Sequence, residues 1–363
     1  MPITRVEFPE SALIAKFATE TVQTKYPDIR GPYNIPSWTV PILEEIYRRP
    51  NINGREVSVF LLKGVYLSRE SLIFNSAGQL YSWSARQNSE EDVILGHRSI
   101  QDAVYYDTIE RCDQRLVMCK RRSPFVFGHW MVDMLPLAYV AGQLLNTGPD
   151  RRFLLHRTMG PMDAIMIDTL ARLGISEYDI RWSDNSPLWC RELIVVSGIS
   201  EHGEYLTSTV RDCHDAVAEG CAGAGHERLF VRRGGQSRNL INEPDLANLA
   251  ETKGFYIFDP NGCDITTQIS VFKDAKIIVG AMGSSLTNLI YSIKCSCVTV
   301  LSPESMPDVF LWFLCQLRGI NYIDMRCPHV GLEPQPPLPI WMRDFYLDPS
   351  VFNKILTEVI GML

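Results

Sequence analysis

The 363-residue sequence lacks several patterns that mark common classes of protein. No uninterrupted apolar run approaches the ~20 residues that a membrane-spanning helix needs. The first residues, MPITRVEFPESALIAKF, have no basic region followed by an apolar core, so we expect no signal peptide. Acidic residues outnumber basic ones, 42 to 35. The resulting net charge of −7 gives no support to nucleic-acid binding through bulk charge, although it leaves a local basic patch open.

The ten cysteines contain no CxxC pair. Cys295 and Cys297 are close and would point to one face of a strand, but we interpret them as buried apolar thiols rather than metal ligands. No HExxH-type helix is present either, so no metal is expected. We therefore expect a reduced, cytoplasmic protein, compatible with peripheral association with a membrane.

The chain divides into regions of different composition. Residues 1–50 are rich in proline and aromatic residues, which predicts an irregular N-terminal arm. Residues 51–220 predict an α/β domain with short strands broken at Gly64, a helix ending near Gly148, the strand RRFLLH, the helix PMDAIMIDTLARLG and the strand RELIVVSG. The glycine-rich stretch AVAEGCAGAGHE marks the expected domain boundary.

From 221 to 340 apolar strands alternate with helices of 10–12 residues. Such alternation is typical of βαβ units around a parallel sheet, with ligands bound at the carboxyl ends of the strands. The region is therefore predicted to be a Rossmann-like domain. The last segment, 341–363, predicts a helix that packs back across the domains. Two α/β domains would place the default ligand site in a cleft between them.

The first candidate for chemistry is FGHWMVDMLP. In a helix, His129 and Asp133 are four residues apart and share one face. A carboxylate beside an imidazole orients the ring and raises its basicity, as a general base requires. A histidine that is only a satisfied core or capping residue is the alternative. The residues alone do not decide between them.

The second candidate is FVRRGGQSRNLINE, where Arg232, Arg233 and Arg238 follow a predicted strand. Arginine matches phosphate oxygens with paired hydrogen bonds, and the glycine pair allows close backbone approach. A solvated cluster of charges is the alternative interpretation.

The third candidate is VGAMGSSLTNLIYS, a strand-to-helix turn of small residues. Gly283, Ser284 and Ser285 would present backbone N–H groups at a helix start, although the P-loop lysine and the dinucleotide spacing are both missing. Alone, the turn is better explained as a tight turn whose serines cap a helix. Together with the arginines it suggests a diphosphate, and hence a nucleotide.

These three stretches, in this order, resemble glycosyltransferase family 61, which is widespread among capsular-polysaccharide and other glycan-building enzymes. The family pattern runs GHWxxDxLP, then SRxxxxxRxxxNExEL, then EQxxxFxxAxxxxGxHGAGLTN. This chain has GHWMVDMLP, VRRGGQSRNLINEPDL and TQISVFKDAKIIVGAMGSSLTN, and the likeness covers about residues 95–305. One departure is Met282, which stands where the family commonly has histidine.

The resemblance implies a GT-B architecture, in which two Rossmann-like domains face a cleft, and an inverting transfer without an essential metal. A nucleotide-sugar would bind mainly to the C-terminal domain as a substrate, with no cofactor. The acceptor, a glycan or a lipid-linked glycan, would bind mainly to the N-terminal domain. The sequence does not name the sugar, the nucleotide base, the acceptor or the oligomeric state.

An inverting transfer needs a base at the acceptor hydroxyl and positive charge at the leaving diphosphate. Either His129 or Asp133 could be the base. Arg233, Arg238 and the turn would hold the diphosphate. Further candidate nucleotide or sugar contacts are Gln268, Asn288 and Glu304.

Two other functions stay open on the sequence. One is a different nucleotide- or phosphate-dependent transferase that uses the same anion-binding turns. The other is a glycan- or nucleotide-binding module without catalysis, which Met282 favours and the complete GHWMVD stretch disfavours. A scaffolding subunit has no feature in its favour beyond the aromatic-rich N-terminal arm.

Overall fold

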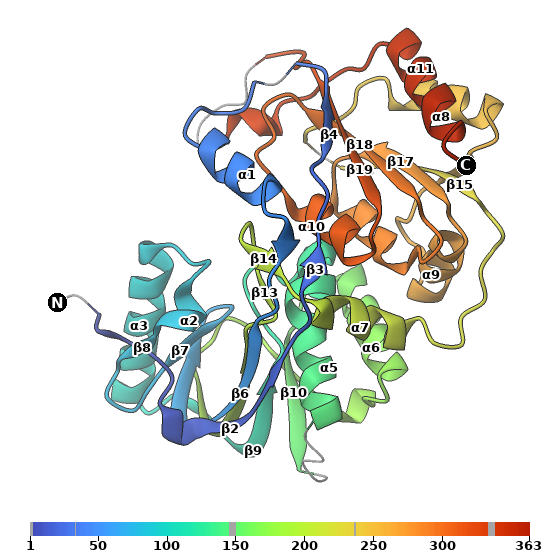
Figure 1. The fold of residues 1–363 in the computed structure, drawn as a ribbon. Helices are drawn as coiled ribbons and strands as arrows, with labels where there is room; N and C mark the ends of the chain where they lie inside the picture. The colour runs from blue at the N-terminus through green and yellow to red at the C-terminus, as the bar shows by residue number, and fades with distance from the viewer. Residues whose placement is uncertain (1–2, 33, 145–149, 236, 333–337) are drawn as a thin grey trace. The chain divides into compact units, whose positions relative to one another are not determined.

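A computed structural model describes residues 3–32, 34–144, 150–235, 237–332 and 338–363. The chain forms two compact units, each built from two stretches of sequence (Figure 1). Unit 1 comprises residues 1–20 and 54–201, and unit 2 comprises residues 21–53 and 202–363. The division therefore falls at residue 201, ahead of the glycine-rich stretch. That stretch begins inside helix α7 (Ser208–Val217).

Unit 1 is built on a nine-stranded mixed sheet with the order β1-β8-β7-β6-β12-β9-β10-β11, and β2 also pairs with β6. Its neighbours β12, β9, β10 and β11 run parallel, whereas β6 pairs antiparallel with β12, β2 and β7. The strands are β1 (Arg5–Val6), β2 (Leu13–Ala18), β6 (Glu56–Ser68), β7 (Leu72–Phe74), β8 (Leu80–Tyr81), β9 (Glu110–Met118), β10 (Arg151–His156), β11 (Ile180–Ser183) and β12 (Leu188–Ser197).

The predicted strand break at Gly64 is wrong. Strand β6 runs through this glycine, which has φ of 61°, a value that glycine adopts without strain. The predictions of β10, β12 and helix α6 are confirmed, and α6 begins at Pro161 and is followed by Gly174 with φ of 74°.

The helices of unit 1 include short 3₁₀ turns and one π-helix. They are η1 (Glu10–Ala12), α2 (Ser82–Ala85), α3 (Glu90–Tyr105), α4 (Phe127–His129), the π-helix η2 (Trp130–Met134), α5 (Leu135–Leu144), α6 (Pro161–Arg172) and η3 (Glu177–Asp179). The helix end expected near Gly148 lies outside the described residues. A short strand, β13 (Ser200–Glu201), follows β12.

Unit 2 is built on a six-stranded sheet whose pairings are all parallel, in the order β16-β15-β17-β18-β19-β4. Every residue of β17 and β18 is buried, as expected for strands covered on both faces. The predicted alternation of strands and helices beyond residue 221 is confirmed. The strands are β4 (Asp28–Arg30), β15 (Arg228–Val231), β16 (Tyr256–Phe258), β17 (Ile277–Ala281), β18 (Cys297–Pro303) and β19 (Asn321–Cys327).

Helices connect the strands of unit 2, and one of the predicted helices is a 3₁₀-helix. The helices of this unit are α1 (Val40–Tyr47), α7, α8 (Glu243–Thr252), α9 (Ile265–Lys273), the 3₁₀-helix η4 (Ser284–Tyr291), α10 (Phe310–Leu317), η5 (Ile340–Met342) and α11 (Pro349–Ile360). Three short strands complete the unit: β3 (Val22–Gln23), β5 (Asn51–Ile52) and β14 (Tyr205–Leu206).

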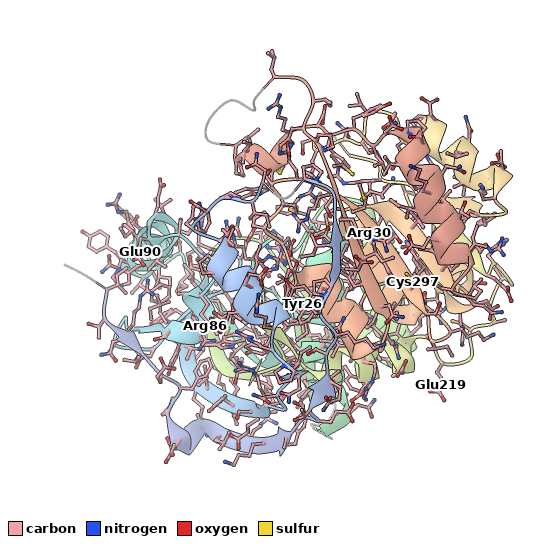
Figure 2. The ribbon with its side chains drawn as sticks, turned by 45° about the horizontal axis from the view of Figure 1, so that its top comes forward. Tyr26, Arg30, Arg86, Glu90, Glu219 and Cys297 are labelled. Carbon is pink, nitrogen blue, oxygen red and sulfur yellow. The ribbon has the colours of Figure 1, made fainter. Side chains whose placement is uncertain are left out.

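The first fifty residues are not an irregular arm. Strands β1 and β2 join the sheet of unit 1, and β4 forms the edge of the sheet of unit 2. Tyr26 and Arg30 accordingly lie with Cys297 in unit 2 (Figure 2). These strands are two to six residues long and separated by prolines, so their period is too short to stand out in the sequence.

The C-terminal helix is present as predicted. Helix α11 packs on α8 within unit 2, and the ring of Phe352 meets that of Phe230 with 6.0 Å between centroids. It therefore belongs to the core of the unit that carries the parallel sheet. A search of the described helices finds none that is both long and apolar enough to cross a membrane.

Candidate functional site

His129 and Asp133 form a hydrogen-bonded pair in unit 1. His129 ends the short helix α4, and Asp133 lies in the π-helix η2 that follows directly. His129 Nδ1 lies 2.8 Å from Asp133 Oδ2. The side chain of His129 is 26% exposed and that of Asp133 only 4%. A π-helical turn is rare and occurs frequently at functional sites, so the local backbone also singles out this pair.

Both carboxylate oxygens of Asp133 are engaged. Ser200 Oγ donates to Oδ1 at 2.7 Å, while Oδ2 faces His129. Burial raises the pKa of Asp133, but the hydrogen bond from His129 and the charge of Arg121 outweigh it, so the pKa lies below its ordinary value. In the neutral tautomer in which Nδ1 carries the proton and donates to the ionised Asp133, the lone pair of the His129 ring lies on Nε2. The hydrogen bond from Nδ1 thus fixes the orientation of the His129 ring, and the side chain of Asp133 is enclosed by its hydrogen-bond partners.

Arg121 and Ser200 are functional candidates that the sequence did not reveal. Arg121 is buried, with its guanidinium 4.9 Å from the ring centroid of Trp83. Its Nη1 donates to the carbonyl oxygen of Ser200 at 3.4 Å, and its Nη2 lies 3.7 Å from Glu201. Arg121 thus holds the backbone that carries the Ser200 hydroxyl. Only the basic run KRRSP ahead of the histidine motif hinted at it.

In unit 2, Arg233 crosses the turn that begins at Gly283. A Cβ atom built on Gly283 would lie 2.8 Å from Arg233 Nε, and one built on Gly235 would lie 3.3 Å from Arg233 Cζ. The two glycines therefore make room for this guanidinium. Arg233 Nη1 also donates to the carbonyl oxygens of Ser237 and Arg238, which closes the loop on itself. The second and third sequence motifs thus come together.

Arg233 and Arg238 are half-buried and lie close enough to each other to interact through their charges. Burial and the charge of Arg238 lower the pKa of Arg233 to about 10, and burial lowers the pKa of Arg238. Within the described part of the chain, no carboxylate lies at ion-pairing distance from either guanidinium. Arg238 Nε also has no hydrogen-bond partner there. The charges of Glu243 and Asp344 act on Arg233, and that of Asp308 on Arg238, from beyond ion-pairing distance. Two neighbouring, half-buried cations without a direct ion pair are suited to binding an anion.

Arg232 is placed differently from its neighbours. Its side chain is 43% exposed, and its Nε lies 3.6 Å from Glu243 Oε2. Glu243 Oε1 accepts the backbone N–H of Arg233 at 2.8 Å, and burial raises the pKa of Glu243. Arg232 is thus partly neutralised, whereas Glu243, the acidic residue of the motif NLINE, fixes the strand end that carries Arg233.

The turn after β17 differs in detail from the predicted α-helix start. Helix η4 is 3₁₀, and its cap residue, Gly283, has no side chain to accept from the first N–H groups. Ser284 is exposed and Ser285 half-buried. Dipole arguments made for an α-helix apply less directly to eight residues of 3₁₀-helix.

Gln268 and Asn288 brace this turn from behind. Both are buried, and Asn288 Nδ2 donates to Gln268 Oε1 at 2.7 Å and to Ser285 O at 3.2 Å. Gln268 Nε2 in turn donates to Cys263 O at 3.0 Å. Asn288 Oδ1 has no hydrogen-bond partner among the described residues, and a direct contact of these amides with a nucleotide or sugar stays a prediction. Their hydrogen bonds fix the backbone of the turn.

Met282 and Glu304, the two remaining positions considered around the turn, are also held by the protein. Met282 is buried, and its N–H donates to Leu301 O at 2.9 Å, so its side chain belongs to the core. Glu304 follows β18 and is half-buried. Its Oε1 accepts the backbone N–H of His329 at 3.1 Å, which occupies one of the oxygens expected to meet a ribose.

The cysteine pair after η4 is packed into the structure. Cys297 is buried and Cys295 half-buried, and burial raises their pKa values to about 11 and about 12. All ten cysteines are free thiols. Among the residues that the structure describes, no three His, Cys, Asp or Glu side chains are arranged as metal ligands.

Residues 127–299 match the family model of glycosyltransferase 61. Over this region, which is slightly less than half of the chain, the sequence is similar to glycosyltransferase 61, and the match indicates that the protein is a glycosyltransferase. The matched region contains the His129–Asp133 pair, the loop that carries Arg232, Arg233 and Arg238 (the arginine loop) and the turn at Gly283. Arg121 and Glu304 lie outside it. A search among curated proteins finds no match to this chain.

Proposed function

We propose that this glycosyltransferase transfers a sugar from a nucleotide-sugar to a hydroxyl group of a glycan or lipid-linked glycan. The transfer inverts the configuration at the anomeric carbon of the sugar. The proposal combines the family with two features of the chain. One is an oriented imidazole in unit 1, and the other is an arginine pair in unit 2 that has no ion-paired carboxylate among the described residues. This arginine pair carries the proposal, because two neighbouring arginines without a direct ion pair indicate an anionic group such as a diphosphate.

His129 is the proposed base. Its Nε2 removes the proton from the acceptor hydroxyl as the oxygen attacks the anomeric carbon. Asp133 holds Nδ1–H and stabilises the imidazolium that forms. Asp133 is less suited to be the base because it is buried and both of its oxygens accept hydrogen bonds. Of the two allocations open on the sequence, we favour the one with His129.

The leaving group is a nucleoside diphosphate. As the bond between the anomeric carbon and the diphosphate oxygen breaks, negative charge grows on the phosphate. Arg233 and Arg238, with the backbone of Gly283–Ser285, are the groups proposed to stabilise it. Arg232 and Glu304 are proposed to contact the outer parts of the donor. In this proposal the step needs no metal, because the arginines supply the positive charge.

The proposal also covers the setting of the reaction. It assigns donor binding to the parallel-sheet unit, acceptor binding to the unit with His129, and the GT-B arrangement to the pair. We further propose a cytoplasmic enzyme of surface-polysaccharide or other glycan synthesis. These points rest on the resemblance to the family.

The test is incubation of the purified protein with uridine, guanosine, cytidine and thymidine diphosphate sugars. Release of the nucleoside diphosphate is followed in the presence and absence of glycan acceptors. We expect one nucleotide class to be turned over, and proton NMR of the product to show an inverted anomeric centre. Binding of nucleoside diphosphates without turnover of any sugar would favour the non-catalytic module. A retained configuration would contradict the inverting mechanism.

A further inference from the structure

The backbone of the arginine loop is held in an unfavourable conformation. Arg238 has φ of 56°, in the left-handed region that residues with a side chain rarely adopt. Such a conformation persists only where the surroundings impose it, and it costs on the order of one hydrogen bond. The contacts that impose it should therefore lie next to Arg238.

The segment from Met342 to Leu347 supplies these contacts. The N–H of Arg238 donates to Met342 O at 3.1 Å. Asn239 O accepts from the N–H of Phe345 at 2.9 Å, and Phe345 O accepts from the N–H of Ile241 at 3.0 Å. The arginine loop thus lies along this segment as a short strand-like pair.

Asp344 makes the side-chain contribution to this pairing. Its Oδ1 accepts the backbone N–H of Asn239 at 2.6 Å and lies 3.2 Å from Asn239 Nδ2. Asn239 follows Arg238 directly, so the carboxylate fixes the peptide that leaves the left-handed residue.

The same segment is anchored to the sheet. The N–H of Val330 donates to Asp344 O at 2.9 Å, and Arg343 Nε donates to Val330 O at 3.2 Å. Val330 comes three residues after β19, at the carboxyl end of the parallel strands. Asp344 therefore connects the arginine loop to the carboxyl end of the parallel strands, where the turn at Gly283 also lies.

We propose that Asp344 is a positioning residue of the donor site: it holds Arg238 at the orientation in which the guanidinium receives the diphosphate. The inference rests on the proposed function, and it adds a part of the chain beyond the family match at residues 127–299. Asp344 touches no substrate: it acts through its hydrogen bond to Asn239, and its charge also favours the charged form of Arg233, an effect that Asp344→Ala and Asp344→Asn remove alike.

The test uses the full-length protein and calorimetric titration with uridine, guanosine, cytidine and thymidine diphosphates, taking the one that binds the wild type best. Asp344→Ala removes the acceptor for Asn239 and should weaken binding about tenfold. Asp344→Asn keeps a carbonyl oxygen in the same place, so it should lose no more than about threefold.

Asp348→Ala is the matched control. Asp348 lies four residues further on, and its Oδ1 accepts the N–H of Ser350 at the start of α11. This variant should lower thermal stability without changing the affinity. A change in stability alone is thereby separated from a loss of positioning.

A second readout does not depend on the ligand. Brief digestion with trypsin should cleave the bond after Arg238 faster in Asp344→Ala than in the wild type or Asp348→Ala, because the loop has lost its brace. If the wild type bound no nucleoside diphosphate, the proposed function would fail while trypsin still tested the brace. Wild-type affinity in Asp344→Ala, or unchanged cleavage after Arg238, would overturn the inference. If Asp344→Ala did not fold, affinity in Asp344→Asn as weak as that of Arg238→Ala would exclude the acceptor role.

Discussion

The charged groups of the His129–Asp133 pair and those of the arginine loop differ in how they are paired. Asp133 has a hydrogen-bond partner on each oxygen and a pKa below its ordinary value. Arg233 and Arg238 have depressed pKa values, no ion-pairing carboxylate among the described residues, and a left-handed residue in their loop. The carboxylate of the first site is fully hydrogen-bonded, whereas the arginines of the second site have no direct ion pair among the described residues.

The difference indicates two kinds of task. An oriented imidazole needs a fixed partner before any substrate arrives, so its surroundings are complete. A site for a multiply charged anion must carry excess positive charge, which is unfavourable until the anion binds. Unit 1 is thus suited to proton transfer and unit 2 to anion binding. The changes below test this contrast, beginning with the largest expected effect.

Replacement of His129 by alanine should have the largest effect on turnover. Loss of a general base lowers the rate by roughly 10²–10⁴-fold, and we expect about 10³ for His129→Ala. The measurement is the initial rate of nucleoside diphosphate release at saturating donor and acceptor. His226→Ala, which removes a histidine stacked on Tyr256 in unit 2, serves as the control and should keep the wild-type rate. A near wild-type rate in His129→Ala would exclude it as the base.

Replacement of Arg238 by alanine should act on binding. Charge-assisted hydrogen bonds are worth about 1.5–3 kcal/mol, so Arg238→Ala should weaken the affinity for the nucleoside diphosphate about 10–100-fold. Arg228→Ala removes an arginine from the opposite end of β15 and should leave the affinity unchanged. The two dissociation constants are compared by calorimetry. Equal values would mean that the loop is not the anion site.

Replacement of Gly283 by alanine should displace the side chain of Arg233 and thereby weaken nucleoside diphosphate binding. Its Cβ would lie 2.8 Å from Arg233 Nε, so the guanidinium must move, and we expect an affinity loss of about three- to tenfold, or ~1 kcal/mol. In Gly142→Ala the nearest atom is 3.7 Å away, on Ile175, and the substitution should leave binding unchanged. Unchanged affinity in Gly283→Ala would show that Arg233 can shift without loss.

The ionised state of Asp133 should be visible in stability. Its folded pKa is below the ordinary value of 3.8, so its contribution is present above that pH and is lost as the pH falls through the folded pKa. We expect Asp133→Asn to be less stable than the wild type by about 1 kcal/mol at neutral pH. Denaturant unfolding from pH 7 to pH 3 should show the difference shrinking below pH 3.8. A difference that grows on acidification would contradict the assigned ionisation.

The smallest effect is expected from relieving the backbone of Arg238. Glycine adopts φ of 56° without strain, so Arg238→Gly should be more stable than Arg238→Ala by up to about 1 kcal/mol. Thermal unfolding of the two variants measures it. Both should bind the nucleoside diphosphate equally weakly, because both lack the guanidinium. A less stable glycine variant would show that the left-handed conformation is not a source of strain.

The parallel sheet of unit 2 could be predicted because each strand is a continuous apolar run between helices. Unit 1 could be predicted less well, because β1 and β2 are short and β6 passes through Gly64. The spacing of His129 and Asp133 predicted their contact, since a local helical turn sets it. The contacts of Ser200 and Asp344 depend on segments 67 and 105 residues away in sequence, for which no local pattern gives a signal.

Burial also adds what residue type alone does not show. Gln268 and Asn288 have the amide groups that nucleotide contacts use, yet both are buried and hydrogen-bonded to each other. Met282 replaces a histidine in the family pattern and lies in the core. Which polar side chains face a ligand is thus decided by packing, which the motif letters do not contain.

The most direct test of the division between proton transfer and anion binding is a calorimetric titration of the same nucleoside diphosphate into His129→Ala and Arg238→Ala. We predict the wild-type dissociation constant for His129→Ala and an increase of about 10–100-fold for Arg238→Ala. An affinity loss in His129→Ala as large as that in Arg238→Ala would contradict it, since the histidine would then belong to the anion site.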